Sequence, residues 1–371
     1  RNIFYPFLKN IILFYEKFVP RFLNKKVIIA SYMNLFDLAK FQISLGQMPY
    51  LRGPEIKYSN NKIDLKLRKS IKLEKNSSGF RGFISSLIPF HIPKVYLEGF
   101  DDFKSKVIKA YPSNPEIIFT SNAYQADDAF KIWAAEKVSE GRKLVIGQHG
   151  GNFGNSLFNQ TEDHQLNIAD YFISWGWKNS KNPFIKPLPS LKLSNQDIIC
   201  KNNGKIVHVL TSFPKYFYCH YSVPVADQFL SYVDNQISFL KNLDLKVLDN
   251  LIIKPDPSFF NQSWDAKQLI SKAGFSNNFD TRGRNFYTLL SCSNLCVCTN
   301  NTTTFLETLA LNYPTVIFWD KNLFEIREEA ISYMKLLEDA GVLYYCPLQA
   351  SKKINSISNN VEDWWGNSAL Q

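Results

Sequence analysis

Short apolar runs separated by stretches with helical periodicity dominate the first half of the chain. The clearest unit is a run at 116–120, a helical stretch over about 126–139, and a second run at 143–147. Further runs at 26–30 and 171–175 have the same length and composition. This alternation is typical of a parallel sheet covered by helices. We therefore expect these four runs to be strands of one sheet.

A second group of apolar runs follows residue 204. A helix is expected near 224–242, and the strands of this second sheet are expected at 205–210, 251–254, 295–298 and 315–319. The stretch from 179 to 204 is rich in Asn, Lys, Pro and Ser, which is typical of an interdomain linker. The chain is thus predicted to be an α/β protein of two doubly wound, Rossmann-type domains facing each other across a cleft. The predicted domains are 1–195 and 196–345, followed by a tail at 346–371 that is expected to pack back on the N-terminal domain.

Bulk properties agree with two domains and add an anionic partner. The chain has 371 residues and a net charge of +10, which favours a sugar nucleotide, an acidic glycan, a nucleic acid or a membrane surface as the partner. The six cysteines show neither a disulfide framework nor zinc-ligand spacing, so we expect a reducing cytoplasm and no metal.

One segment near the N-terminus has an apolar side. Residues 3–22 read as an amphipathic helix interrupted by charged residues, and nowhere is there an apolar stretch long enough to span a bilayer. Packing against its own domain is the favoured interpretation of this helix. Peripheral contact with the inner face of the bacterial inner membrane is the alternative.

The motif GQHGGNFG at 147–154 directly follows a predicted buried strand. Ligands of open parallel sheets bind beyond the carboxyl ends of strands, so this loop is a candidate site. We expect His149 to act as an acid or base, and Gln148, Gly150, Gly151 and Asn152 to contact a donor. A tight turn without a ligand is the alternative. Neither the dinucleotide fingerprint nor the phosphate-loop lysine is present.

Acidic and aromatic residues follow this loop. Glu162 is the preferred catalytic carboxylate, with Asp163 beside it, although both could instead cap a helix. Trp175 and Trp177 offer flat faces for stacking on a sugar, and a role in the core is equally plausible.

Phosphate-binding chemistry is expected in the second half. Lys254 ends an apolar strand in the sequence Lys254-Pro255-Asp256-Pro257, and Arg282 and Arg284 are further candidates for phosphate contacts. The segment 296–319 reads as strand, polar turn, helix and strand, so its helix would present free N–H groups to an anion. The candidate ligands at this helix are Asn301, Thr302, Thr303 and Thr304, with Glu307 placed for a ribose.

Taken together, these segments resemble a family of transferases from bacterial O-antigen and surface-polysaccharide gene clusters. The resemblance rests on GQHGGNFG, TEDHQLNIADYFISWGW, TNNTTTFLETLALNYPT and the terminal VEDWW. The C-terminal half is more distantly similar to bacterial sialyltransferases and Kdo transferases of the GT-B fold, in which a His-Pro pair and a Ser/Thr cluster hold CMP. Here Asp256 stands where histidine is usual, while Thr302, Thr303 and Thr304 match the cluster.

The resemblance implies a metal-independent glycosyltransferase with a GT-B-like fold and no cofactor. Its first-choice donor is a CMP-activated nonulosonic or octulosonic acid, and its acceptor is a surface glycan or a lipid-linked glycan. A UDP-, dTDP- or GDP-sugar is the alternative donor. A sugar-nucleotide epimerase of the same fold and a polyanion-binding protein are the rival functions, and nucleic acid is not an expected partner.

Overall fold

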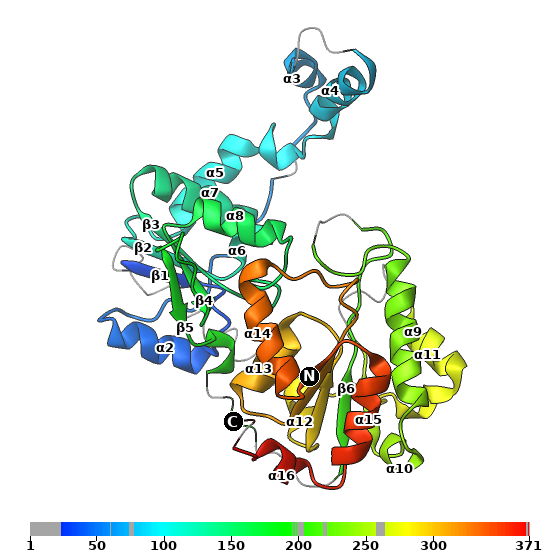
Figure 1. The fold of residues 1–371 in the computed structure, drawn as a ribbon. Helices are drawn as coiled ribbons and strands as arrows, with labels where there is room; N and C mark the ends of the chain where they lie inside the picture. The colour runs from blue at the N-terminus through cyan, green and yellow to red at the C-terminus, as the bar shows by residue number, and fades with distance from the viewer. Residues whose placement is uncertain are drawn as a thin grey trace. The chain divides into compact units, whose positions relative to one another are not determined.

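The computed structural model describes residues 24–59, 61–73, 78–194, 196, 198, 204–217, 221–256, 264–368 and 370. The predicted amphipathic helix at 3–22 and Pro257 lie outside the described residues. The chain forms two compact units: the first contains 1–147, 168–173 and 181–186, and the second contains 148–167, 174–180 and 187–371 (Figure 1). The histidine-glycine loop therefore belongs to the second unit, whereas the sequence assigned it to the first domain.

The first sheet has five strands in the order β1-β2-β3-β4-β5. Their bounds are β1 (Lys26–Ile29), β2 (Ile117–Thr120), β3 (Lys143–Gly147), β4 (Tyr171–Trp175) and β5 (Ile185–Leu188). The pairs β1–β2, β2–β3 and β3–β4 are parallel. All four predicted strands are confirmed. The fifth, β5, lies in the predicted linker, and its position at the edge of the sheet explains how it accommodates Pro187.

Helices pack beside this sheet around a buried aromatic centre. Their bounds are α2 (Leu35–Ser44), α3 (Leu65–Ser70), α4 (Gly79–His91), α5 (Phe100–Ala110), α6 (Ala123–Ala126) and α7 (Asp128–Ser139). Trp133 of α7 is fully buried, stacks on Tyr111 at 4.8 Å between ring centroids, and donates its indole N–H to the Pro112 carbonyl at 2.9 Å. Because the indole N–H has a hydrogen-bond partner, the large ring fills the core without leaving a buried polar group unpaired.

The second sheet also has five strands, in the order β10-β9-β8-β6-β7, and all the pairs are parallel. The strands are β6 (Ile206–Val209), β7 (Leu251–Lys254), β8 (Leu295–Cys298), β9 (Thr315–Phe318) and β10 (Leu343–Tyr344). Because the chain passes from β6 to one side and later returns to the other, the order reverses between β6 and β8. Such a reversal defines a doubly wound sheet and its ligand-binding edge. The described strands of the first sheet keep chain order instead.

Helices and short turns complete the second unit. They are α8 (Gln160–Ile168), η3 (Leu191–Leu193), α9 (Gln228–Lys241), α10 (Leu245–Leu248), α11 (Ala266–Ile270), η4 (Ser271–Phe275), η5 (Ser276–Asn278), α12 (Phe286–Leu290), α13 (Thr303–Ala310), α14 (Glu328–Asp339), α15 (Pro347–Ile357) and α16 (Val361–Trp365). The tail joins the core of this unit: α15 contacts α9 and β9, and Trp365 donates to the Asn312 carbonyl at 3.1 Å. The sequence instead led us to expect the tail on the N-terminal domain.

Two sequence expectations concern membranes and metals. Within the described ranges, no helix combines the length and apolar character needed to cross a membrane. Over the same ranges, no cluster of three or more His, Cys, Asp and Glu side chains is arranged to hold a metal ion. Cys296 and Cys298 lie on one face of β8, buried, with their Sγ atoms 3.8 Å apart.

Candidate active site

The site begins at the carboxyl edge of the second sheet, where the strand order reverses between β6 and β8. A buried hydrogen-bond chain ties the two strand ends together. Thr299, after β8, donates its hydroxyl to the Val209 carbonyl at 2.7 Å and lies 2.6 Å from the Tyr232 hydroxyl, which accepts from the Thr211 amide at 3.0 Å. The loops that leave this edge therefore start from fixed positions, as a preorganised ligand site requires.

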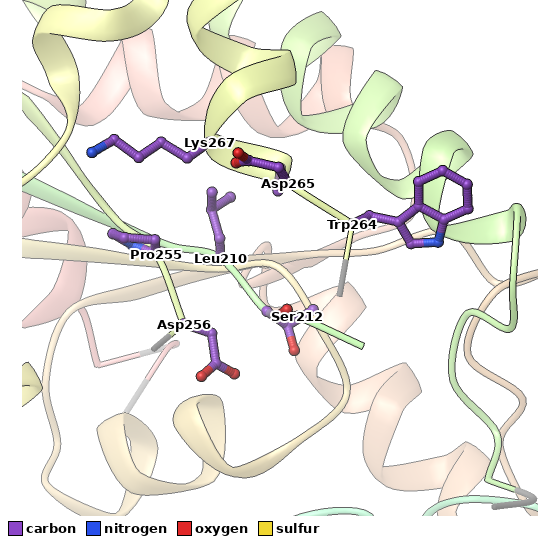
Figure 2. A pocket seen from close by; sticks show the side chains of 9 residues that line it. Leu210, Ser212, Pro255, Asp256, Trp264, Asp265 and Lys267 are labelled. Carbon is purple, nitrogen blue, oxygen red and sulfur yellow. The ribbon is translucent and has the colours of Figure 1, made fainter. Parts of the chain in front are cut away.

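A cavity of 160 Å³ opens beside the ends of β6 and β7 (Figure 2). Its lining includes Ser212, Asp256 and Lys267. Figure 2 shows the Lys267 side chain extending away from Asp256, and its Nζ lies 5.6 Å from the centroid of the Phe279 ring. Because an ionised carboxylate only accepts hydrogen bonds and repels phosphate, Asp256 suits hydroxyl or amino groups of a ligand.

The predicted basic residues lie near the same edge. Lys254 is the last residue of β7, and Asp280 is placed beside that strand by a 2.9 Å hydrogen bond from its amide to the Ile253 carbonyl. The Asp280 carboxylate accepts from the Arg284 amide at 2.7 Å and from its Nε at 2.9 Å. Burial acts to raise the pKa of Asp280, but these hydrogen bonds prevail and the pKa is lowered. Arg284 thus holds its own loop together, while Arg282 is exposed.

The start of α13 forms the other side of this edge. Asn300 accepts from the Thr302 amide at 3.0 Å and also from the Thr302 hydroxyl, so that hydroxyl is turned back into the turn. Thr303 and Thr304 follow as the first two residues of the helix. The amide groups of a first helical turn have no partner within the helix and carry the positive end of its dipole. This end can therefore bind an anion.

The histidine-glycine loop packs directly on this helix start. The Gly151 amide donates to the Thr303 hydroxyl at 2.8 Å. A Cβ atom on Gly151 would lie 2.1 Å from the Thr302 carbonyl carbon, so no larger residue fits without moving the backbone. The two motifs that the sequence singled out are therefore brought into contact.

Gln148 and a tryptophan fix the beginning of the loop. The Gln148 Oε1 atom accepts from the Trp175 amide at 2.9 Å and from the Trp177 indole N–H at 2.8 Å, and its Nε2 donates to the Gly150 carbonyl at 2.7 Å. A Cβ on Gly154 would lie 2.6 Å from the indole of Trp177. Gln148 and Trp177 thus position the loop, in place of the donor contact and the sugar stacking that the sequence suggested.

Glu162 has a similar positioning role. Its side chain is 2 % exposed, and it accepts from Arg327 at 2.8 Å on Oε1 and at 3.0 Å on Oε2. Oε2 also accepts from the Gly154 amide at 2.9 Å, and Arg327 donates to the Ser156 carbonyl at 2.9 Å. With both oxygens engaged in an ion pair, Glu162 is poorly placed to take a proton from a substrate. We therefore describe it as a positioning residue, whereas the sequence led us to expect a catalytic carboxylate.

His149 is half-buried and oriented by two neighbours. Its ring lies edge-on to Phe153 at 5.1 Å, and its Nδ1 is 3.4 Å from the Nε2 atom of Gln165. The contact with the Gln165 side chain and the ring contact with Phe153 together hold the plane of the imidazole ring. Asp163, the other predicted catalytic acid, is exposed on α8.

Glu307 and Trp175 occupy positions farther along α13 and β4. Glu307 is buried and forms an ion pair with Lys192 at 2.5 Å. Burial, and next the charge of Glu307, raise the pKa of Tyr287. Trp175 lines an open, mainly apolar cavity of 750 Å³ together with Leu306 of α13. The carboxylate predicted to bind a ribose is thus already paired with a lysine that no sequence motif indicated.

Comparison with known proteins adds a family to this geometry. A family model described as LIC12162 family transferase matches residues 1–371. The chain belongs to the LIC12162 family of transferases. No curated protein shows a significant match to this transferase.

Two solved structures are similar to this LIC12162 family transferase. One is WaaG, titled a glycosyltransferase involved in lipopolysaccharide biosynthesis, with 12 % identity, a TM-score of 0.35 and coverage of 76 % of this chain and 79 % of that chain. The other is CalG4, titled the calicheamicin glycosyltransferase, with 9 % identity, a TM-score of 0.35 and coverage of 76 % and 80 %. The two five-stranded sheets and the helices between their strands make the transferase an α/β protein.

The polar residues of this LIC12162 family transferase divide into two groups. Glu162, Gln148 and Arg284 hold loops in place through their hydrogen bonds. The second group lies at the sheet edge or on the loop that packs there, and it comprises His149, Ser212, Lys254, Asp256, Thr303 and Thr304. Asn152 adopts a left-handed conformation, and the Asn155 side chain donates to the buried Asn301 at 2.8 Å. The side-chain carbonyl oxygen of Asn301 therefore joins the loop to the helix turn.

Proposed function

We propose that this transferase is a glycosyltransferase that binds a nucleotide sugar at the carboxyl edge of its second sheet. The observation that carries the proposal is the contact between the Gly151 backbone and the first turn of α13. Two residues span at most about 7 Å, so this contact keeps His149 close to a helix end suited to phosphate. An acid–base group beside an anion site is what transfer from a phosphate leaving group requires.

The two sides of this edge differ in charge, and this difference orients the donor. Its phosphate lies at the amides of Thr303 and Thr304, where the helix dipole favours negative charge. Its nucleoside occupies the cavity lined by Ser212 and Asp256, because a carboxylate there accepts from hydroxyl and amino groups but repels phosphate. Lys254 adds positive charge at the end of β7.

His149 supplies the proton transfer. In the proposed step, the acceptor hydroxyl oxygen bonds to the anomeric carbon while the bond from that carbon to the donor phosphate breaks. The neutral imidazole of His149 takes the acceptor proton and becomes imidazolium, and the phosphate departs as an anion held at the amides of Thr303 and Thr304. Glu162 acts only through the loop that it fixes to Arg327.

The favoured donor is a CMP-activated nonulosonic or octulosonic acid, and the favoured acceptor is a bacterial surface glycan. The threonines at the start of α13 and the family resemblance support CMP. Asp256 stands where the similar transferases have histidine, so UDP-, dTDP- and GDP-sugars are the alternatives to be tested alongside it.

Nucleotide release measured with and without an acceptor glycan tests the proposal. We expect free nucleotide only when acceptor is present, and a loss of at least about a hundredfold in turnover on His149→Ala. His164→Ala is the matched control, because this exposed histidine lies on α8 and should leave turnover unchanged. Interconversion of the sugar nucleotide without acceptor would instead identify an epimerase. Full activity in His149→Ala would remove the loop from the catalytic site.

A further inference from the structure

A helical hairpin in the first unit carries much of the positive charge of the protein. This α3–α4 hairpin, residues 61–94, contains eight lysines and arginines and two acidic residues, in a chain with a net charge of +10. Figure 1 shows α3 and α4 lying beyond α5, away from the first sheet. Neither the fold of the sheet nor the proposed catalytic site uses this element.

The exposed side of α4 is apolar. Phe80, Phe83, Ile84, Leu87 and Ile88 recur at the spacing of one helix face. The side chains of Phe80 and Phe83 are 79 % and 58 % exposed. Residues on the opposite face are small or buried, with Pro89 fully buried and Gly82 and Ser85 half-buried. The helix therefore packs its less apolar face on the protein and exposes its apolar face. A helix that contributes to a core has the opposite orientation.

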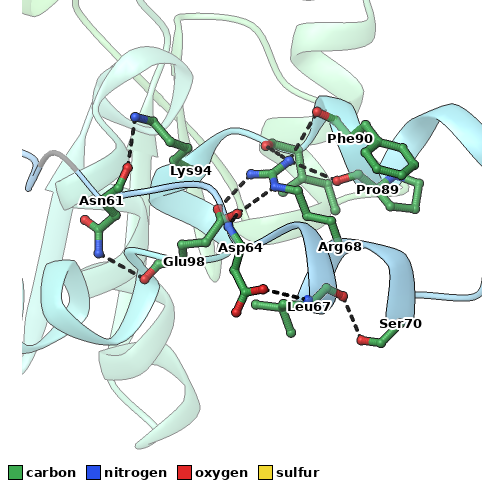
Figure 3. A network of polar contacts seen from close by, with 10 residues as sticks. Asn61, Asp64, Leu67, Arg68, Ser70, Pro89, Phe90, Lys94 and Glu98 are labelled. Carbon is green, nitrogen blue, oxygen red and sulfur yellow. Dashed lines mark hydrogen bonds and ion pairs between the residues drawn. The ribbon is translucent and has the colours of Figure 1, made fainter.

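A polar network holds the hairpin from inside (Figure 3). Arg68 of α3 donates to both oxygens of Glu98 at 2.6 and 2.7 Å. The same guanidinium donates to the carbonyls of Pro89, Phe90 and Ile92 at 2.9, 3.2 and 3.0 Å, which satisfies the C-terminal end of α4. Because these contacts fix the hairpin without its aromatic side chains, the apolar face remains available.

Exposed basic residues lie on the same hairpin as the apolar face. The exposed cations of α3, of the residues that follow it and of the first turns of α4 are Lys66, Lys69, Lys72 and Arg81. Asp64 is the one acidic residue of the hairpin within the described ranges, and its carboxylate caps α3 by accepting from the Leu67 amide at 2.9 Å. A phenylalanine-rich face on an element that also carries several exposed lysines is the pattern of an element that lies in the interface of an anionic bilayer.

We propose that the α3–α4 hairpin docks this protein on anionic phospholipid bilayers. Phe80 and Phe83 insert at the level of the acyl boundary, while Lys66, Lys69 and Lys72 contact the headgroups. A soluble polyanion would engage the lysines but leave the aromatic face in water, and an apolar protein partner would not need the lysines. This inference does not depend on the proposed transferase reaction.

Sedimentation with phosphatidylcholine vesicles, with and without phosphatidylglycerol, tests this docking. We expect the wild-type chain to bind the phosphatidylglycerol vesicles, and Phe80→Ser/Phe83→Ser to bind them at least about tenfold more weakly. Leu245→Ser is the matched control, since that leucine is equally exposed, at 79 %, but lies in the second unit. Unchanged thermal unfolding of each variant shows that its fold is intact.

A charge variant separates the two parts of the surface. Lys66→Gln/Lys69→Gln/Lys72→Gln should weaken binding to phosphatidylglycerol vesicles on the order of a hundredfold in low salt, with little further loss when salt is raised. Equal binding of wild type and the phenylalanine variant would overturn the proposal. It would also be overturned if the wild type bound vesicles of phosphatidylcholine alone equally well. A third contrary result is that the wild-type chain self-associates without vesicles, that the phenylalanine variant does not, and that this difference accounts for the sedimentation.

Discussion

Each unit of the protein contains an arginine–glutamate pair, and the two pairs are built alike. In the first unit Arg68 binds both oxygens of Glu98, and in the second Arg327 binds both oxygens of Glu162. Each glutamate also accepts from a backbone amide, Asp64 in one case and Gly154 in the other. Each arginine also donates to a backbone carbonyl, that of Pro89 in one case and that of Ser156 in the other.

What the two pairs hold in place is different. The Arg68 pair fixes a hairpin whose outer face is apolar and basic, whereas the Arg327 pair fixes a polar, glycine-rich loop at a helix end. Burying a charge pair gives little net stability, but removing one partner leaves an uncompensated charge. The comparison teaches that the same arrangement can position surfaces for two different partners, a bilayer and a phosphate. It also predicts that the two functions can be lost separately.

The largest effect is expected from breaking either pair. Arg68→Met should lower the free energy of unfolding of its unit because Glu98 loses both guanidinium hydrogen bonds, and Arg327→Met should lower that of the second unit by about 3 kcal/mol. Denaturant titration followed by hydrogen exchange in each unit measures both. The exposed Arg81→Met serves as the control, with an expected change within about 0.5 kcal/mol.

The same two variants test the separation of functions. Arg68→Met should lose vesicle binding and keep nucleotide binding, while Arg327→Met should do the opposite. If either variant lost both functions at a temperature where both units remain folded, the comparison between the pairs would fail.

The next effect concerns the contact that the Arg327 pair supports. Gly151→Ala places a methyl group 2.1 Å from the Thr302 carbonyl carbon, so the loop must move away from α13. A displacement of about 1 Å at a reacting group costs about a hundredfold in turnover. Gly53→Ala is a suitable control, because its Cβ would meet the nearest atom at an ordinary 3.4 Å. Turnover unchanged in Gly151→Ala would show that the contact is not needed.

The units should also differ in their response to acid. Burial lowers the pKa of His208, in β6, to about 4, whereas hydrogen bonds from Arg68 lower that of Glu98 to about 2. Between pH about 6.5 and about 4, the unfolded chain binds more protons at His208 than the folded chain does. The free energy of unfolding of the second unit therefore decreases by about 3 kcal/mol as the pH falls through this range. Stability from Glu98 is present above pH about 4.5 and is lost only as pH falls toward 2.

Denaturant titrations between pH about 7.5 and about 4.5 measure this difference, because that range covers most of the His208 window and lies above the Glu98 window. His208→Gln should abolish the loss of stability of the second unit over that range, since glutamine does not titrate. An unchanged pH dependence in this variant would assign the loss to other groups.

The smallest effect is expected at one hydroxyl of the proposed phosphate site. Thr304→Val should weaken nucleotide binding about fivefold, the contribution of one hydrogen bond, without changing stability. Thr304→Ser restores a hydroxyl and should restore the affinity. Calorimetric titration distinguishes the three proteins, and equal affinities would place the phosphate elsewhere.

The sequence predicted the strands well and the partners of the site poorly. Runs such as 251–253 and 295–298 are apolar throughout, which is a local signal, and both lie in strands. Arg327 lies 165 residues from Glu162 and in no motif, so no local pattern indicates their pairing. Lys192, the partner of Glu307, lies in the segment interpreted as a linker.

In the α3–α4 hairpin, the sequence shows a local pattern but not the direction in which the apolar face points. Phe80, Phe83 and Ile84 have helical spacing, which normally predicts a face directed at the core. Only the burial of Pro89 on the other side of α4 shows that the apolar face points outward. Periodicity thus indicates that a helix has two faces, but not which of them the tertiary structure covers.

Isothermal titration of the wild-type chain with CMP, CDP, UDP, dTDP and GDP tests most directly whether a nucleotide binds where the loop meets α13. We predict that one of these nucleotides binds and raises the melting temperature. Gly151→Ala should abolish that binding, whereas Phe80→Ser/Phe83→Ser should retain it. Binding of none of the five, or equal binding to Gly151→Ala, would contradict a donor site at this edge of the second sheet.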